Sequence, residues 1–190
     1  MTKIYFSKTN FHEKTAPSEV KKMQSEYCRQ IISEAVCKEF GLNPHEIIFS
    51  KDANGKPYLA NFPEIHFNIS HTHSAVAAAI SNKPVGIDIE LIKSGSDSKI
   101  LKIAKKMFLP HEFEYITENQ NESAKRFYEI WTKKEAYVKY LGTGIFSNVG
   151  EFNAMGFDVL ALDSDVKINT FFVEQWVISV CGDNVTDLKY

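Results

Sequence analysis

The order of helical and strand-like segments is the feature of this sequence that most limits its fold. A short strand-like run at residues 3–6 precedes a long helical segment at residues 17–40. Five strand-like runs then lie between residues 46 and 91, three helical segments follow up to residue 141, and strand-like runs return after residue 157. This order is neither a regular strand–helix alternation nor all-strand. It predicts an α+β fold with antiparallel sheet.

Helical spacing is clearest in the first helix, where apolar residues recur every three or four positions and Gly41 supplies a stop signal. After it we expect strands at Glu46–Ser50, Pro57–Ala60, Ile65–Ile69, Ala75–Ser81 and Val85–Leu91. The expected helices are Ile100–Phe108, Pro110–Thr117 and Glu122–Leu141, and the closing strands are Phe157–Leu162, Val166–Val173 and Gln175–Val180.

Bulk properties exclude several classes of protein. The 190 residues carry a formal net charge of −2, which argues against a nucleic-acid coat or a membrane-binding face. Cys28, Cys37 and Cys181 are odd in number and far apart, as in reduced proteins with small buried thiols. Neither a signal-peptide core nor a long apolar run is present, so we expect a cytoplasmic protein.

An acidic pair lies in the last of the five strand-like runs. Alternate residues of a strand share a face, so Asp88 and Glu90 point away from Ile87 and Ile89, which face the core. Neighbouring carboxylates repel each other unless a proton or cation lies between them, and oxygen ligands suit Mg²⁺. Gly86 permits the close approach of a ligand or of another backbone. The pair indicates either a metal site or an ordinary solvated strand face.

The longest predicted helix carries charged residues at unusual positions. Its core stripe comprises Phe127, Ile130, Lys134, Val138 and Leu141. A lysine in this phase is unexpected because an unpaired buried charge is costly, and both a structural and a functional interpretation of Lys134 stay open. Trp131, Glu135 and Lys139 share a neighbouring face. Glu135 and Lys139 are either a surface ion pair or part of a site.

A third group of residues lies at a strand end and in a turn. Ser70 and His71 end the run Phe67–His71, where a hydroxyl and an imidazole can meet a phosphate, although such a pair is often structural. Lys56 lies upstream in an exposed turn. Ser70 lacks the Gly-x-Ser-x-Gly surroundings of a hydrolase nucleophile, which argues against serine catalysis.

In this order and spacing, the segments resemble the 4′-phosphopantetheinyl transferase superfamily, in its Sfp-type branch. The matching segments are NGKP at 54–57, FNISH at 67–71, VGIDIE at 85–90, WTKKEAYVKYLGTG at 131–144 and the closing strand WVISVC. The resemblance covers roughly residues 20–180. It implies an enzyme that moves the 4′-phosphopantetheine arm of coenzyme A to a serine of an acyl, peptidyl or aryl carrier protein and releases adenosine 3′,5′-bisphosphate.

The resemblance also implies roles for individual residues. Asp88, Glu90 and Glu135 match the acids that hold Mg²⁺, with Mn²⁺ as an alternative. Lys139 matches a lysine near the transferred phosphate, and Glu135 is the candidate base, acting directly or, as we favour, through a metal-bound water. The residues implied to bind coenzyme A are Ser25 and Arg29 at the 3′-phosphate, Lys56 and Pro57 at the adenine end, and Ser70 and His71 at the phosphates of coenzyme A, with Lys134 as another basic residue at the site.

The implied fold has two similar lobes with pseudo-twofold symmetry and the active site in the cleft between them. Residues 1–84 would form an N-terminal lobe that binds coenzyme A, and residues 85–190 a C-terminal lobe with the metal ligands and the catalytic helix. Because one chain carries both lobes, we expect a monomer. The carrier protein is expected to dock at Lys102–Phe113, where lysines surround apolar side chains, although two ordinary amphipathic helices would give the same pattern.

Some features depart from the family pattern. The chain is short for this branch, Thr72 and His73 stand where small residues are frequent, and Thr143 stands where a basic residue is frequent. These departures bear on which carrier proteins are accepted and on how tightly coenzyme A is held, and none touches the expected metal ligands.

Two other functions compete with the transferase interpretation. A metal-dependent phosphohydrolase would cleave coenzyme A without a carrier protein, whereas a non-catalytic binding module would tolerate the loss of Glu135 and Lys139.

Overall fold

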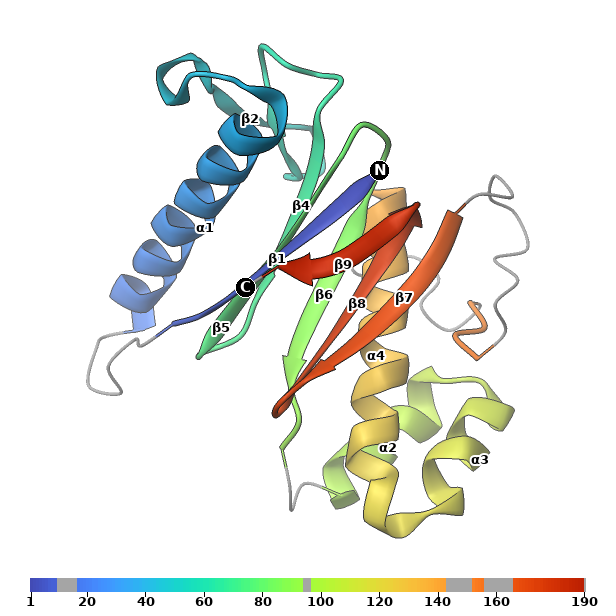
Figure 1. Cartoon of the computed structure of the whole chain (residues 1–190). Coiled ribbons are helices and arrows are strands. Elements are labelled where there is room, and N and C mark those ends of the chain that lie inside the picture. The colour runs from blue at the N-terminus through green and yellow to red at the C-terminus, as the bar shows by residue number, and fades with distance from the viewer. Residues whose placement is uncertain (10–16, 94–96, 143–151, 156–165, 190) are drawn as a thin grey trace.

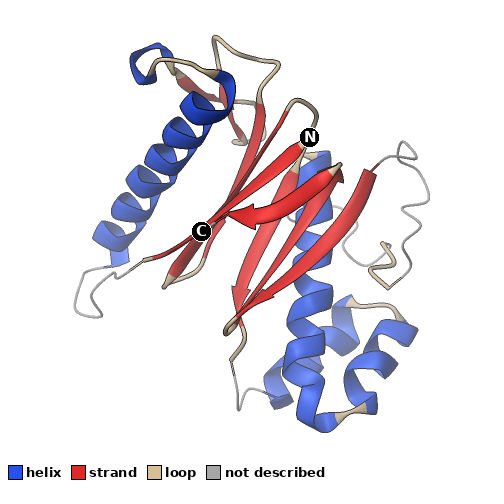
Figure 2. Cartoon of the chain, viewed as in Figure 1, coloured by secondary structure: helices blue, strands red, loops and turns tan. Residues whose placement is uncertain are grey.

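The computed structural model describes residues 1–9, 17–93, 97–142, 152–155 and 166–189. Helices and strands occupy separate parts of the molecule, with strands in the middle (Figures 1 and 2). The helices are α1 (Pro17–Phe40), α2 (Asp97–Met107), α3 (Pro110–Glu118) and α4 (Ser123–Leu141), with short 3-10 helices at Pro44–Glu46 and Gln120–Glu122. The strands are β1 (Thr2–Lys8), β2 (Phe49–Lys51), β3 (Pro57–Leu59), β4 (His66–His71), β5 (Ala75–Ser81), β6 (Gly86–Leu91), β7 (Val166–Val173), β8 (Trp176–Asp183) and β9 (Val185–Lys189).

The first sheet has the strand order β4-β5-β1-β9. β5 pairs antiparallel with both of its neighbours, whereas β9 runs parallel to β1. α1 lies along one side of this sheet (Figure 1), and its apolar residues pack against β4 and β5. The side chains at the centre of this packing are Ile32, Ala35, Val36, Phe67, Ala78 and Ile80. The hairpin of β2 and β3 closes one end of this core through Leu59.

The second sheet is antiparallel, in the order β6-β8-β7, and packs against the first sheet. Apolar residues from both sheets meet in a shared core that includes Ile4, Phe6, Ile87, Ile89, Ile178 and Val180. The prediction that the two isoleucines of β6 face the core is therefore confirmed. The opposite face of β6, which carries Asp88 and Glu90, lies against α4.

α4 joins the second sheet to a helical subdomain. Its aromatic side packs against α2 and α3, where Phe108 stacks on Phe127 with ring centroids 5.4 Å apart. Its other side meets the sheet, where the Thr132 hydroxyl contacts the Ser179 hydroxyl at 2.8 Å. The predicted core stripe of α4 is confirmed except at Leu141, which is 41% exposed near the end of the helix.

The mixed α+β architecture agrees with the sequence prediction. The bounds of α1, β5 and β7 are those expected, whereas the strand expected at Phe157–Leu162 lies outside the described residues. β9 was not expected, and it returns the end of the chain to the sheet of β1. The pseudo-twofold symmetry and the boundary between residues 84 and 85 stay predictions. No helix in the described ranges is both long enough and apolar enough to cross a bilayer.

Gly86 sets the distance between β6 and α4. A Cβ atom added to Gly86 would lie 2.0 Å from the carbonyl oxygen of Ala136 and 2.4 Å from the backbone nitrogen of Tyr140. Real Cβ atoms do not approach other atoms so closely, so only glycine lets the helix backbone rest on the strand. The sequence left open whether a ligand or a backbone approaches Gly86, and the structure places the backbone of α4 there.

We expect Gly86→Ala to lower the free energy of unfolding by about 3 kcal/mol or more, because α4 must move away from β6. Gly182→Ala on β8 is the control, since its added Cβ would meet side-chain atoms at 3.3 Å. That variant should cost only about 1 kcal/mol. Urea denaturation followed by circular dichroism measures both, and equal losses would contradict this role of Gly86.

Candidate active site

Asp88 of β6 contacts two side chains from two other elements, Ser70 of β4 and Lys139 of α4. Its Oδ1 atom accepts a hydrogen bond from the Ser70 hydroxyl at 2.7 Å and from Lys139 Nζ at 2.6 Å. Lys139 Nζ also donates to the Ser70 hydroxyl at 3.0 Å, which closes a triangle of contacts. Asp88 is only 5% exposed, and its other oxygen, Oδ2, is buried with no hydrogen-bond partner among the described residues. The carboxylate is thus held firmly through one oxygen while the other is left without a partner.

Local structure explains why these residues meet. Alternation on β6 turns Asp88 toward α4, and the contact at Gly86 brings Lys139 within reach. β4 is held beside β6 by Asn68, whose side-chain oxygen accepts the backbone N–H of Ile87 at 3.0 Å. Ser70, two residues further along β4, shares the face of Asn68 and therefore also points to β6.

Two further acids lie near this triangle. Burial and the charge of Asp88 raise the pKa of Glu90 to about 7. Burial, followed by the charge of Asp88, also raises the pKa of Glu135, which is 8% exposed. Lys139 opposes both shifts. Lys93 also lowers the pKa of Glu90. The three carboxylates still outnumber the two lysines, so their negative charge is only partly compensated.

This charge imbalance bears on the expected metal site. Within the described ranges, no three His, Cys, Asp or Glu side chains already stand close enough together to hold an ion. The unpartnered Oδ2 of Asp88 and the raised pKa of Glu90 are what buried acids show when a cation would stabilise them. Carboxylate oxygens fit Mg²⁺, which usually also takes ligands from water and substrate phosphate. The residues therefore fit a cation shared with a phosphorylated ligand.

A pocket of about 530 Å³ lies between α1 and the strands β2 to β4. Four of the residues expected to bind coenzyme A line it: Ser25, Arg29, Pro57 and His71. Cys28, Phe49, Ser50, Lys51, Gly55, Phe67 and Ile69 complete the lining. Ser70 and His71 leave β4 on opposite faces, so His71 lines this pocket. Ser70 instead joins Asp88, Glu90, Glu135 and Lys139, a group that we call the Asp88 cluster.

Lys56 and Lys134 have protein partners of their own. Lys56 Nζ donates to the backbone carbonyl of Lys139 at 2.7 Å, and burial lowers the pKa of Lys56. Lys134 is fully buried in an ion pair with Glu112 on α3, at 3.0 Å. Lys134 Nζ also donates to the carbonyl of Phe152. This pairing supports the structural interpretation of the lysine in the core stripe.

Glu112 explains how a charged pair can be fully buried. Its two oxygens accept backbone N–H groups from Leu109, at 2.9 Å, and from Ala154, at 2.7 Å, in addition to the lysine. Burial lowers the pKa of Lys134, and the hydrogen bond to Glu112 opposes that effect. Sequence analysis missed Glu112 and the bridging Asn68, because neither partner is visible in local spacing. Both residues stabilise the site from outside it.

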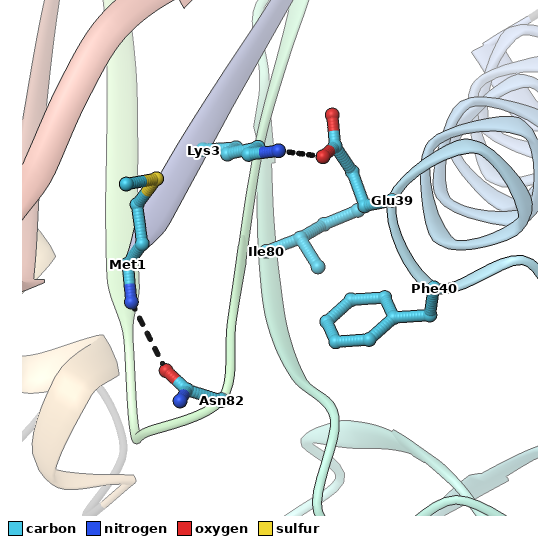
Figure 3. Close-up of a pocket in the computed structure, with 6 residues that line it drawn as sticks. All are labelled: Met1, Lys3, Glu39, Phe40, Ile80 and Asn82. Atoms are coloured by element: carbon cyan, nitrogen blue, oxygen red, sulfur yellow. Dashed lines mark hydrogen bonds and ion pairs between the residues drawn. The ribbon is translucent and has the colours of Figure 1, made fainter.

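A second hollow, of about 230 Å³, lies between the start of β1 and the end of α1 (Figure 3). Lys3 and Glu39 pair across it, and the amino group of Met1 donates to the Asn82 side chain at 3.1 Å (Figure 3). Glu39 also accepts hydrogen bonds from Tyr5 and Lys189. None of the predicted site residues lines this hollow.

Comparison with known proteins places these residues in a family. The family model described as the 4′-phosphopantetheinyl transferase superfamily matches residues 84–181, more than half of the chain. This range includes all four charged residues of the Asp88 cluster. The chain belongs to the 4′-phosphopantetheinyl transferase superfamily. A second family model, 4′-phosphopantetheinyl transferase, N-terminal, matches residues 19–83, which include the pocket-lining part of α1.

Individual relatives agree with this assignment. The chain is 40% identical over 132 residues to the 4′-phosphopantetheinyl transferase gsp of Aneurinibacillus migulanus, covering 65% of this chain and 52% of the relative. It is 32% identical over 124 residues to the transferase Sfp of Bacillus subtilis, with 65% and 54% covered. The human L-aminoadipate-semialdehyde dehydrogenase-phosphopantetheinyl transferase is 32% identical over 149 residues, with 73% and 47% covered. The chain spans about half the length of these curated relatives.

Glu90 makes the stability of the ligand-free protein depend on pH. Its pKa in the folded state, about 7, lies above the ordinary value of 4.5, so the folded protein binds more protons within this window. Stability should therefore fall as the pH rises from about 4.5 to 7. We expect Glu90→Gln to reduce this loss in the free energy of unfolding by about 1–2 kcal/mol, because Glu90 is partly solvated.

Denaturation curves of both proteins at pH 5 and pH 8 test this expectation. Glu114→Gln, at an exposed position on α3, serves as the control. If Glu90→Gln is no more stabilising at pH 8 than at pH 5, the assigned charge repulsion is wrong.

Lys134→Met should destabilise the protein by about 3–5 kcal/mol, because it leaves the Glu112 carboxylate buried without its cation. Lys133→Met, which removes a partly exposed pair with Glu129, should cost less than about 1 kcal/mol. Urea denaturation compares the two variants, and coenzyme A binding is measured on each. A stable Lys134→Met protein with weakened coenzyme A binding would instead support the direct ligand role.

Proposed function

We propose that this chain transfers the 4′-phosphopantetheine group of coenzyme A to a serine of an apo carrier protein. The observation that carries the proposal is the Asp88 cluster, in which one acid is tied to Ser70 and Lys139 while two further acids lie nearby. The four charged residues of the cluster lie within the range matched by the superfamily model, residues 84–181. It provides both the oxygen ligands and the positive charge that transfer of a phosphate-containing group requires.

Donor binding is assigned to the pocket beside α1. Arg29 and His71 can meet phosphate groups of coenzyme A there, while Phe67 and Ile69 offer apolar surface to the adenine. We assign Ser25 to the 3′-phosphate and Pro57 to the adenine end, since both line this pocket. Ser70, on the opposite face of β4, would lie toward the diphosphate, close to Asp88.

Asp88, Glu90 and Glu135 would hold a Mg²⁺ ion, or Mn²⁺, together with oxygens of the donor. Such an ion offsets negative charge on both phosphates of the donor. In the transfer, the serine oxygen of the carrier forms a bond to the phosphorus that bears the pantetheine. The bond from that phosphorus to the bridging oxygen breaks, and adenosine 3′,5′-bisphosphate leaves.

Two residues of α4 support this displacement. Lys139 stabilises the charge that grows on the leaving phosphate, because its ammonium is already held at the site by Asp88 and Ser70. Glu135 takes the proton of the attacking serine. A carboxylate that also holds a cation is a weakened base, so we favour passage of the proton through an intervening water over direct transfer.

The carrier protein is proposed to dock at Lys102–Phe113. Lys102, Lys105 and Lys106 are exposed on α2 and would face the acidic helix that carrier proteins present. The apolar residues contribute less to this surface than the sequence suggests, because Phe108 is buried in the helical core. The enzyme is expected to act as a monomer in the cytoplasm, with the lobe boundary after residue 84.

Intact-protein mass spectrometry tests the proposal directly. An apo carrier protein incubated with the chain, coenzyme A and Mg²⁺ should gain one phosphopantetheine, and EDTA or Asp88→Ala should prevent the gain. Glu135→Gln should abolish transfer while coenzyme A still binds. Glu129→Gln, which changes another partly buried glutamate of the same helix, should retain it.

The other outcomes favour other functions. Cleavage of coenzyme A without transfer would favour a phosphohydrolase. Binding without any modification across several carrier proteins would favour a non-catalytic module. Retained turnover in Glu135→Gln would remove this residue from the mechanism.

A further inference from the structure

The turn between β2 and β3 is rigidly built. Asp52 Oδ1 accepts the backbone N–H groups of Asn54, at 2.9 Å, and of Lys56, at 2.8 Å. The backbone carbonyl of Asp52 accepts the N–H of Gly55 at 3.0 Å, and Gly55 has a positive φ of 83°. The turn therefore holds the side chains of Asn54 and Lys56 in fixed directions.

Both of these side chains donate hydrogen bonds to backbone carbonyls at the C-terminal end of α4. Lys56 Nζ donates to the carbonyl of Lys139 at 2.7 Å, and Asn54 Nδ2 donates to the carbonyl of Gly142 at 3.0 Å. The last carbonyls of a helix lack partners within the helix, and a positive charge there is favourable for the helix dipole. The two side chains thus cap α4 from a distant part of the chain.

The capped end of α4 carries Lys139, the lysine whose side chain reaches the Asp88 cluster. Lys139, whose carbonyl receives the Lys56 ammonium, sends its own ammonium to Asp88. The turn also adjoins the pocket, which Gly55 and Pro57 line. One short turn therefore connects the wall of the pocket to the backbone of the residue that reaches the Asp88 cluster.

We propose that Asn54 and Lys56 form a clasp that positions Lys139, with Lys56 acting as a positioning residue. The amine of Lys56 donates its hydrogen bond to the C-terminal end of α4, and this contact partly buries the side chain. This assignment differs from a direct role at the adenine end of coenzyme A. Its catalytic consequence rests on the proposed transferase function, whereas its effect on the end of α4 does not.

Hydrogen exchange and kinetics separate the two roles of Lys56. In Lys56→Met the amide of Gly142, which bonds to the Val138 carbonyl at 3.0 Å, should exchange about tenfold faster, as expected for loss of one hydrogen bond. The value of kcat should fall at least about fivefold because Lys139 is misplaced, while the Kd for coenzyme A changes less than about twofold. Asn54→Ala should accelerate exchange at the same amide.

The controls make the test specific. Lys38→Met removes an exposed lysine from the last turn of α1 and should change neither exchange in α4 nor turnover. Lys56→Arg keeps a donor on a long side chain and should recover part of the protection and of kcat. Unchanged exchange in Lys56→Met, or weaker coenzyme A binding with unchanged kcat, would overturn the clasp. If the wild-type chain transfers nothing, the proposed function fails, but the exchange comparison still decides whether the clasp exists.

Discussion

The site depends first on the direct contact between the backbone of α4 and Gly86. With no side chain between them, helix and strand approach closely, and the polar face of β6 has to lie against the helix. Asp88 then meets Lys139, and Glu135 lies close enough for its pKa to respond to Asp88. A glycine at one position thus brings charged groups that are far apart in the sequence into one partly buried site.

Two lysines of α4 pair with carboxylates of other elements, and the two pairs differ in how many of the carboxylate oxygens have hydrogen-bond partners. Lys134 and Glu112 are both fully buried, and the carboxylate uses both oxygens on backbone donors as well as the lysine. A pair of this kind is structural because little is left for a ligand. Asp88 has one oxygen that finds no hydrogen-bond partner in the described part of the chain, and it has other acids nearby. Such incomplete compensation is what distinguishes the candidate site from the core.

Much of the local structure could be predicted from residue spacing. The bounds of α1 and β5, and the direction of Asp88 away from the isoleucines of β6, follow from periods of 3.6 and 2 residues. β9 was not predicted because the strand has only five residues and is partly polar. It forms by pairing with β1, which lies at the other end of the chain. The partner of Lys134 escaped because Glu112 lies one helix away, where no periodicity relates the two residues.

The sequence by itself determined most of the helices and strands, the face on which each charged residue lies, and the motifs that indicate the family. Only the tertiary structure decided which of these charged side chains bond to other groups of the protein and which stay available to a ligand. It pairs Lys134 with Glu112, places Lys56 on the end of α4, and separates Ser70 from His71 on the two faces of β4. The physical reason is that periodicity depends on neighbours in the chain. Burial and ion pairing depend on contacts between distant segments, which exist only once the sheets and helices have packed.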